Sequence, residues 1–600
     1  MTLVMPLADA SYAGIQALTQ NVFTPAGGKA LGVALNNGGT VHFARFVVIE
    51  NNLVMASSYD GNFSDYIQMF IHTMGDVFEE IMNFVVDPPP RPVRMYPDAF
   101  VDWVQAHNKA CIGFYSAYPE VSAVQIREAF NLLGPEVTVP EPAPMGLPHD
   151  QLSDIQGLIL RGLGQSMVRH LVLKVTNGPS ARVALGAMAM SGTRGPKITH
   201  GADWGSEKPA SGITVGLTAT GLAALGLPEA SIHSFPTDYL EGAVARAPSV
   251  GDWDYNAPEE WGALSDPDNV HLLFSVYAST PVDLDAACKE VTDSLASGCT
   301  ITTTFDGAVF ADHPNKVHFG YRDNISQPII NGDPVSSPPD GPQDLAPPGE
   351  FLLGYESQFG GVWLDVPQPP ALGINGSFSA FRVLEQNVAG FELFIEEVAA
   401  QAKFDKELVA AKVVGRWRNG VALVEAPGPS MPPDPTRGQP LNNYGYEALD
   451  PAGLRCPVGA HMRRGNPRDQ PMLPLGDGGR RRVMRRGIPY GPEWHAGDPP
   501  DSVARGLLGH FIGASLTLQF ETVMGEWLNR GMTNPDITDT NDVLIGVHQN
   551  PNTFTIPIAP NEPPLNVPVN DLQFTFTRGC IYAFLPSLTA LRWIGELPAN

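Results

Sequence analysis

Three proline-rich stretches interrupt this 600-residue sequence and restrict its folding more than any other feature. They cover residues 87–92, 135–148 and 334–348. Proline fixes the backbone angle φ and lacks an amide hydrogen, so these stretches favour extended backbone outside sheets and helices. A chain of this length also exceeds what one hydrophobic core can organise. We therefore expect three parts, over residues 1–145, 150–345 and 346–600.

Apolar periodicity predicts both strands and helices. Strand-like patterns occur at residues 41–49, 154–160, 171–175, 271–277, 573–577 and 581–584, with the last two expected to form a closing hairpin. Helical spacing occurs at residues 63–86, 218–225, 390–403 and 516–529. The glycine-containing segments 476–479 and 487–491 lack the context of a phosphate-binding loop and are expected to be turns. This mixture favours an α+β fold with antiparallel sheets, compatible with ferredoxin-like units.

The sequence is strongly acidic, with 37 Lys and Arg against 63 Asp and Glu and a formal net charge of −26. Such a charge repels phosphate backbones and anionic lipids, so we expect neither nucleic acid nor membrane as a partner. The start of the sequence lacks a signal-peptide pattern, and no apolar run reaches the roughly 20 residues that cross a bilayer. Five scattered cysteines show no zinc-site or disulfide spacing. We therefore expect a cytoplasmic protein.

A histidine followed by several arginines is the most informative local pattern. His461 lies among small residues in segment 455–468, with Arg463, Arg464 and Arg468 after it. A neutral imidazole in this setting can bind a metal ion, while guanidinium groups bind carboxylates. On spacing alone, a packed or exposed histidine is the more common explanation.

Two further segments carry polar residues suited to catalysis. Residues 318–328 place Asp323 between apolar and aromatic neighbours, where burial would tune its pKa for proton transfer. An Asp-Asn turn or a helix cap is the alternative. Residues 480–491 carry a run of arginines that includes Arg485. The acidity of the remaining chain argues against a nucleic-acid patch there.

Together, these three segments resemble the dye-decolorising peroxidase family. That family combines a Gly-x-x-Asp-Gly motif, an Ala-His-x-Arg-x-x-Asn-Pro-Arg motif and an arginine after Ile/Val-Leu/Met, which correspond here to Asp323, His461 and Arg485. Further blocks agree in order from about residue 154 to the C-terminus. The resemblance implies tandem ferredoxin-like domains with antiparallel sheets that enclose haem b. Residues 1–145 would be an additional α+β extension, also expected to be ferredoxin-like.

The resemblance also implies the function and the roles of the site residues. His461 would bind the iron, Asp323 would transfer a proton of the peroxide, and Arg485 would stabilise charge on the departing oxygen. The expected cofactor-binding residues are His461, Arg463, Arg464 and Arg468. The implied activity is a haem peroxidase that reduces hydrogen peroxide and oxidises bulky organic donors such as dyes and phenols through a ferryl intermediate. The alternatives are a haem-binding protein that handles haem or removes its iron, and a non-catalytic scaffold. A homo-oligomer is a possible state for each of these proteins.

The sequence departs from the family pattern at two places. Asn324 replaces the last glycine of the distal motif, and asparagine tolerates left-handed backbone angles better than most residues. In segment 505–511, Gly509 takes the place of the phenylalanine of a Leu-Leu-Phe run, so Leu507, Gly509 and His510 are candidates for a widened distal pocket. The alternative for His510 is a hydrogen-bonded structural histidine.

Tyr490 is a candidate relay for electrons from bulky donors to a buried cofactor. It follows Arg485 by five residues in the expected turn of segment 487–491, which would hold it near the arginine. The alternative is a packed aromatic side chain without a redox role.

Overall fold

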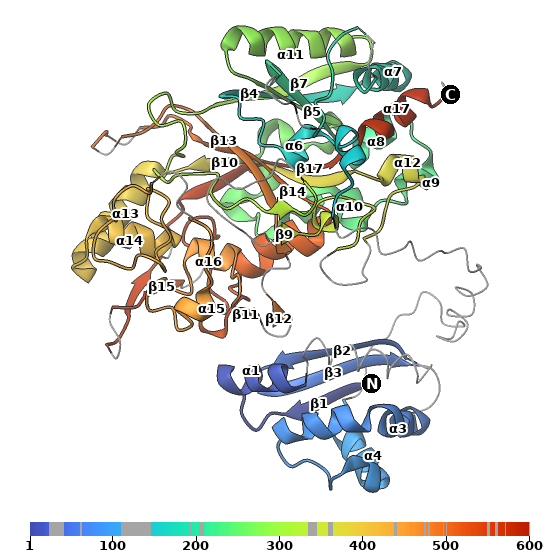
Figure 1. Ribbon diagram of the computed structural model, residues 1–600, viewed down its shortest axis with the longest axis vertical. Helices are drawn as coiled ribbons and strands as arrows, with labels where there is room; N and C mark the ends of the chain where they lie inside the picture. Colours follow the sequence, from blue (N-terminus) through green and yellow to red (C-terminus); the bar gives the residue numbers. More distant parts are fainter. Residues whose placement is uncertain are drawn as a thin grey trace. The chain divides into compact units, whose positions relative to one another are not determined.

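The chain forms two compact units, residues 1–141 with 471–478, and residues 142–470 with 479–600. Figure 1 shows the computed structural model, which describes all residues except 23–40, 60–62, 110–145, 191–193, 203, 205–208, 334–344, 358–363, 437–440, 473–475, 478–480, 496, 500, 549–551, 559–561, 570–571 and 599–600. Most of the two later proline-rich stretches, and half of the glycine-containing segment 476–479, lie outside the described residues.

The first unit contains a three-stranded antiparallel sheet in the order β1-β3-β2. Its elements are β1 (Thr2–Pro6), α1 (Tyr12–Asn21), β2 (Val41–Ile49), β3 (Asn52–Tyr59), α3 (Phe63–Ile81) and α4 (Pro97–His107). Apolar residues of the sheet and of the three helices form one buried cluster, in which Tyr66 and Phe100 are among the largest side chains. The unit is therefore an α+β fold with its own core.

The second unit is built on an eight-stranded sheet in the order β13-β14-β10-β17-β5-β6-β4-β7, and every neighbouring pair is antiparallel. The first half of the unit supplies β4 (Met167–Val175), α7 (Gly178–Met188), β5 (Ser211–Leu217), β6 (Leu272–Ala278), α11 (Pro281–Leu295) and β7 (Cys299–Ala308). The second half supplies β10 (Ser377–Gln386), α13 (Val388–Ala402), β13 (Met484–Tyr490), β14 (Gly506–Gly513), the π-helix η11 (Leu516–Leu528) and β17 (Thr575–Leu585).

Both halves have the same topology. Each follows the order strand, helix, strand, strand, helix, strand, and within each half the second strand in sequence is at one edge, followed by the third, the first and the fourth. This is the arrangement of a ferredoxin-like unit. The two halves join where Phe584 of β17 pairs with Leu217 of β5. This topology confirms the predicted α+β architecture with antiparallel sheets. One hydrophobic core includes residues of both halves, so the division of the chain at residue 345 stays a prediction.

The sheet curls so that its two edge strands approach each other. A Cβ atom added to Gly307 of β7 would lie 2.7 Å from Ile488 of β13. Side chains from three strands meet inside the curl: the rings of His170 of β4 and Phe381 of β10 are 4.6 Å apart, and those of Phe381 and His510 of β14 are 5.1 Å apart. The opposite surface of the sheet is covered by helices, with α7 and α11 over the first half (Figure 1).

Three local predictions were wrong. Residues 154–160 contain the short helix α6 (Gly157–Leu160) rather than a strand, since four apolar residues do not distinguish the two. Residues 487–490 belong to β13 rather than to a turn, because an edge strand tolerates proline. Residues 573–584 form one strand rather than a hairpin. Within this strand the register with β10 shifts, and Arg578 has no partner on β10. The sequence of this β-bulge resembles that of a turn.

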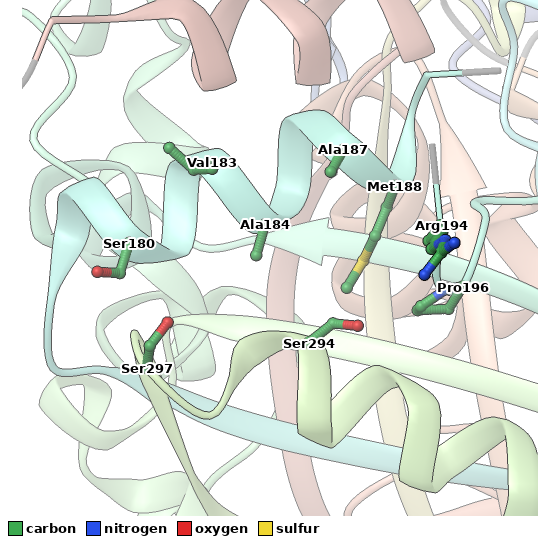
Figure 2. A pocket seen from close by; sticks show the side chains of 9 residues that line it. All are labelled: Ser180, Val183, Ala184, Ala187, Met188, Arg194, Pro196, Ser294 and Ser297. Atoms are coloured by element: carbon green, nitrogen blue, oxygen red, sulfur yellow. The ribbon is translucent and has the colours of Figure 1, made fainter. Parts of the chain in front are cut away.

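A pocket of about 260 Å³ lies between α7 and the end of α11 (Figure 2). Its lining residues are Ser180, Val183, Ala184, Ala187, Met188, Arg194, Pro196, Ser294 and Ser297. None of the predicted site residues takes part in it. In the described part of the chain, no helix is both long and apolar enough to span a membrane.

Candidate active site

His461 begins the short helix α16 (His461–Gly465), within the long connection between α13 and β13. Its Nδ1 lies 3.1 Å from Oδ1 of Asp542, whose side chain is fully buried, while the histidine side chain is 29% exposed. The same Oδ1 accepts hydrogen bonds from the backbone amides of Leu544 and Ile545. A neutral imidazole that donates from Nδ1 keeps a lone pair on Nε2, so this ring can bind a metal ion through Nε2.

The charge of Asp542 is stabilised by its neighbours. Burial alone would raise the pKa of this carboxyl group, but the contact with His461, together with the charge of Arg464, holds it below its usual value. Sequence reasoning missed Asp542 because it lies 81 residues from His461 and belongs to no recognisable motif.

Arg463 and Arg464 lie on α16 but are engaged by protein groups. Arg463 is 1% exposed and donates to Gln470, to the carbonyl of Cys456 and to Asp450. Arg464, which is 2% exposed, donates to the carbonyl of Gly459 and to Thr540.

Burial lowers the pKa of Arg464 to about 10, against the opposing charge of Asp542. The contacts of Arg463 and Arg464 hold the segment around His461 in place. Each guanidinium nitrogen of both arginines already donates to a protein group, so these side chains are not free to bind a cofactor carboxylate.

Arg468 has a different environment, which it shares with Arg416. Both guanidinium groups donate to Oδ1 of Asn442, and both lie over the ring of Tyr444, at 3.8 Å for Arg468 and 5.5 Å for Arg416. Arg416 is 4% exposed, and its Nε is a buried donor without a hydrogen-bond partner among the described residues. Sequence reasoning assigned no role to Arg416. These two cations form a positively charged corner at the end of the histidine segment, in which the Nε of Arg416 is the buried donor without a partner among the described residues.

Arg485 and Asp323 come from different elements and lie close together. Arg485 is on β13, and its guanidinium donates to the carbonyl of Ser326 at 3.0 Å, while its backbone amide donates to Gln327. Asp323 is exposed, and its amide donates to the carbonyl of Asn315 at 2.9 Å. The segment that presents the carboxylate therefore also fixes the arginine.

Electrostatic effects connect this pair with Arg416 and Arg468. Burial lowers the pKa of the Arg485 guanidinium, the carboxylate of Asp323 opposes this shift, and the charges of Arg416 and Arg468 add to it. Arg468 belongs to the segment of His461, so the structure brings the residues of all three predicted motifs into one region. Asn324 adopts a positive φ of 59°, the left-handed angle that the family's glycine would adopt.

Strand alternation separates the three candidates of β14. Arg485 pairs with Phe511 and Pro489 pairs with Leu507, so Leu507 and Gly509 share the face of Arg485. His510 points to the other face, into the curl of the sheet. There its Nε2 bonds to Ser275 and its Nδ1 to Ser379, both at 2.9 Å. These contacts favour the alternative of a hydrogen-bonded structural histidine over a role of His510 in the distal pocket.

Tyr490 also lies on the opposite face from Arg485, because five residues separate them on one strand. At about 3.3 Å per residue, their Cα atoms are roughly 17 Å apart. The carbonyl oxygen of Tyr490 accepts a hydrogen bond from Nε2 of His318 at 2.7 Å. The turn that would have held Tyr490 beside Arg485 is not present.

The donor set suits a cofactor that needs one protein ligand. Among the described residues, no group of three or more His, Cys, Asp or Glu side chains could hold a metal ion. One partly exposed imidazole, oriented by a buried carboxylate, is what a haem iron takes from a protein. The Nε of Arg416, which has no hydrogen-bond partner among the described residues, suits a carboxylate of such a group.

Comparisons with known proteins agree with this description. No family model matches the chain. Peroxidase 2 of Mycetinis scorodonius is 26% identical over 74% of this chain and 87% of the relative. The dye-decolorizing peroxidase of Mycena epipterygia is 28% identical over 64% of this chain and 76% of its own. A solved dye-decolorizing peroxidase in complex with 2,6-dimethoxyphenol has a TM-score of 0.63 and 27% identity, and covers 75% of this chain and 100% of that chain.

The fold and these relatives define an oxidoreductase of the haem peroxidase class. In sequence and fold the chain is similar to dye-decolorising peroxidases, as the three sequence segments predicted.

Proposed function

We propose that this protein binds haem b, reduces hydrogen peroxide and oxidises phenols and dyes. The observation that carries the proposal is the position of Arg485 beside Asp323, in one region with the segment of His461. A peroxidase needs a proton carrier and a fixed cation on the side where peroxide binds. A relative of known structure binds 2,6-dimethoxyphenol, which supports phenols as donors.

His461 would hold the haem iron through Nε2, with Asp542 fixing the ring. Arg416 and Arg468 would bind the haem carboxylates, since Arg416 has a buried donor without a partner among the described residues. Arg463 and Arg464, predicted as cofactor ligands, would instead act by holding the His461 segment. When bound, the haem supplies the redox centre that takes oxidising equivalents from peroxide and passes them to organic donors.

Asp323 and Arg485 would handle protons and charge. Asp323 would accept the proton of one peroxide oxygen and return it to the other as the O–O bond breaks. Arg485 would stabilise the negative charge on the departing oxygen without changing its own protonation state. Leu507 and Gly509, on the face of Arg485, would contribute to the wall of the distal pocket.

Tyr490 remains a proposal as an electron relay for donors that cannot reach the haem. Its place on the other face of β13 means that electrons would cross the sheet rather than follow one turn. A homo-oligomeric state, a cytoplasmic location and the lack of nucleic-acid and membrane partners also stay predictions from the sequence.

The test is an absorption spectrum of the protein with stoichiometric haemin, followed by rapid mixing with hydrogen peroxide and then with 2,6-dimethoxyphenol. Rapid spectral change with peroxide, reversed by the phenol over many turnovers, supports the proposal. Haem binding without turnover would favour a scaffold. Release of iron or loss of the haem spectrum without oxidised phenol would favour haem handling.

A further inference from the structure

Arg418 lies outside all three predicted motifs, yet its contacts converge on the segment that carries Asp323. It belongs to a short hairpin in which the amide of Trp417 donates to the carbonyl of Val421 and Arg416 pairs with Ala422. The hairpin follows α14 (Lys406–Val414) directly. One residue of this hairpin, Arg416, is part of the cationic corner described above, and Arg418 is two residues further along.

Two acidic side chains fix the guanidinium of Arg418. Its NH2 group donates to Glu392 of α13 at 2.6 Å, and its Nε lies 3.3 Å from a carboxylate oxygen of Glu407 of α14. The arginine side chain is 18% exposed and that of Glu392 is 9% exposed, so water screens the pair only weakly. Arg418 is therefore held by two helices.

The same guanidinium packs against the loop before Asp323. It lies over the ring of Tyr321 at 5.5 Å, and the hydroxyl of Tyr321 donates to the carbonyl of Ala410. Gly320 has a φ of +82°, and a Cβ added there would lie 3.0 Å from NH1 of Arg418. Any other residue at position 320 would be strained at this backbone angle and would press on the guanidinium of Arg418.

The backbone of Arg418 completes the attachment. Its carbonyl oxygen accepts a hydrogen bond from the amide of Arg322 at 2.9 Å, and the next amide, that of Asp323, donates to the carbonyl of Asn315. Residues 320–322 are thus fixed by the side chain and the backbone of one arginine. Asp323 itself is exposed, so its position depends on the chain that leads to it.

We propose that Arg418 is a positioning residue for peroxide activation: it transmits the fixed geometry of α13 and α14 to the carboxylate of Asp323. The inference rests on the proposed role of Asp323. A misplacement of about 1 Å caused away from the reacting atoms can slow a reaction by about 10²-fold. Replacement of Arg418 is therefore expected to slow the reaction with peroxide without removing any reacting group.

The first test is a double-mutant cycle on the haem-loaded protein. Arg418→Met is expected to slow the reaction with peroxide by about 10- to 100-fold, with an unchanged resting spectrum and an unchanged KM for 2,6-dimethoxyphenol. In an Asp323→Asn background the same substitution should have almost no further effect, because the group that it positions is gone. Equal losses in both backgrounds would overturn the proposal.

The second test uses hydrogen exchange of the protein without haem. Arg418→Met should increase amide exchange in residues 315–325, with little change in β4 or β17. Glu392→Gln, which keeps the arginine but removes one of its fixed partners, should increase exchange in the same residues to a smaller extent. It serves as the readout if Arg418→Met does not fold. Unchanged exchange in both variants would overturn the proposal.

Arg169→Met is the matched control, since Arg169 also pairs with two carboxylates, Asp285 and Asp306, but lies on β4. It should change neither the peroxide reaction nor exchange in residues 315–325. If Asp323→Asn reacts like the parent protein while Arg418→Met still increases exchange, the proposed role of Asp323 fails and the mechanical connection stands.

Discussion

The guanidinium of Arg485 donates a hydrogen bond to the carbonyl oxygen of Ser326 at 3.0 Å, three residues after Asp323. This bond joins an edge strand of the sheet to the connection between its two halves. The guanidinium of Arg485 is thus bonded to the backbone of the segment that carries Asp323, the carboxylate proposed to act with it on peroxide. This bond orients the arginine side chain before any ligand binds.

Replacement of Arg485 by leucine is expected to slow the reaction with peroxide by about 10²–10³-fold, the usual effect of removing one donor that stabilises developing charge. Stopped-flow absorption with excess peroxide measures this rate. The resting haem spectrum should not change, because the iron ligand is elsewhere. Arg485→Lys should recover only part of the rate, since an ammonium group lacks the planar fork of guanidinium. A parent-like rate in Arg485→Leu would refute the assigned role.

Replacement of Asp542 by asparagine is expected to weaken haem binding by about 10- to 100-fold, the usual effect of removing the group that orients a metal-binding histidine. Titration of the haem-free protein with haemin measures the affinity. His461→Ala should abolish the histidine-ligated spectrum altogether. Asp539→Asn is a suitable control, since Asp539 is exposed and three residues away. Equal affinity of Asp542→Asn and Asp539→Asn would show that the contact with His461 is not important.

The buried histidines predict a loss of stability in acid. Burial lowers the pKa of His510 to about 3 from an ordinary value of 6.5, and burial together with His510 lowers that of His170 as well. Between about pH 6.5 and 3 the unfolded chain binds a proton that the folded histidine does not. The free energy of unfolding should therefore fall by about 1.4 kcal/mol for each pH unit on account of His510 as the pH decreases below 6.5, and His170 should add to this loss.

Urea denaturation of the haem-free protein at pH 7 and pH 4.5 measures this loss of stability. His510→Gln removes one titrating group and should reduce the difference between the two pH values, whereas His495→Gln, at an exposed position, should not. An unchanged difference in His510→Gln would contradict the prediction.

Substitution of Tyr490 by phenylalanine tests the relay. It keeps the ring and its packing but removes the proton that a tyrosyl radical must lose. Turnover of bulky dyes should fall severalfold while oxidation of small phenols and the reaction with peroxide persist. A second readout is the radical signal after addition of peroxide, which should decrease. Unchanged dye turnover with an unchanged radical signal would leave Tyr490 as a packed side chain.

Sequence motifs were enough to find the residues proposed to act through their own chemistry. His461, Asp323 and Arg485 each lie in a local pattern, so one chain was enough to find them. The partners of these residues could not be found in this way. Asp542 is 81 residues from His461, and only the folded chain brings them together. Arg418 acts through contacts with two helices and a loop, none of which leaves a signature in its neighbours.

The orientation of side chains was the other limit. His510 and Gly509 are adjacent in sequence, yet one faces into the curl and the other faces the side of Arg485. Which face is which depends on register with β13, and periodicity alone does not give register. Tyr490 was misplaced for the same reason, because a strand of seven residues was interpreted as a turn.

The repeated topology of the two halves makes their connections directly comparable. Between α7 and β5 the first half spans residues 189–210, whereas the second half, between α13 and β13, spans residues 403–483 and contains His461, Arg416, Arg418 and Arg468. Residues 296–298 join α11 to β7, whereas residues 529–574, which include Asp542, join η11 to β17. The histidine and its carboxylate partner thus lie in two connections that are much longer in the second half than their counterparts in the first.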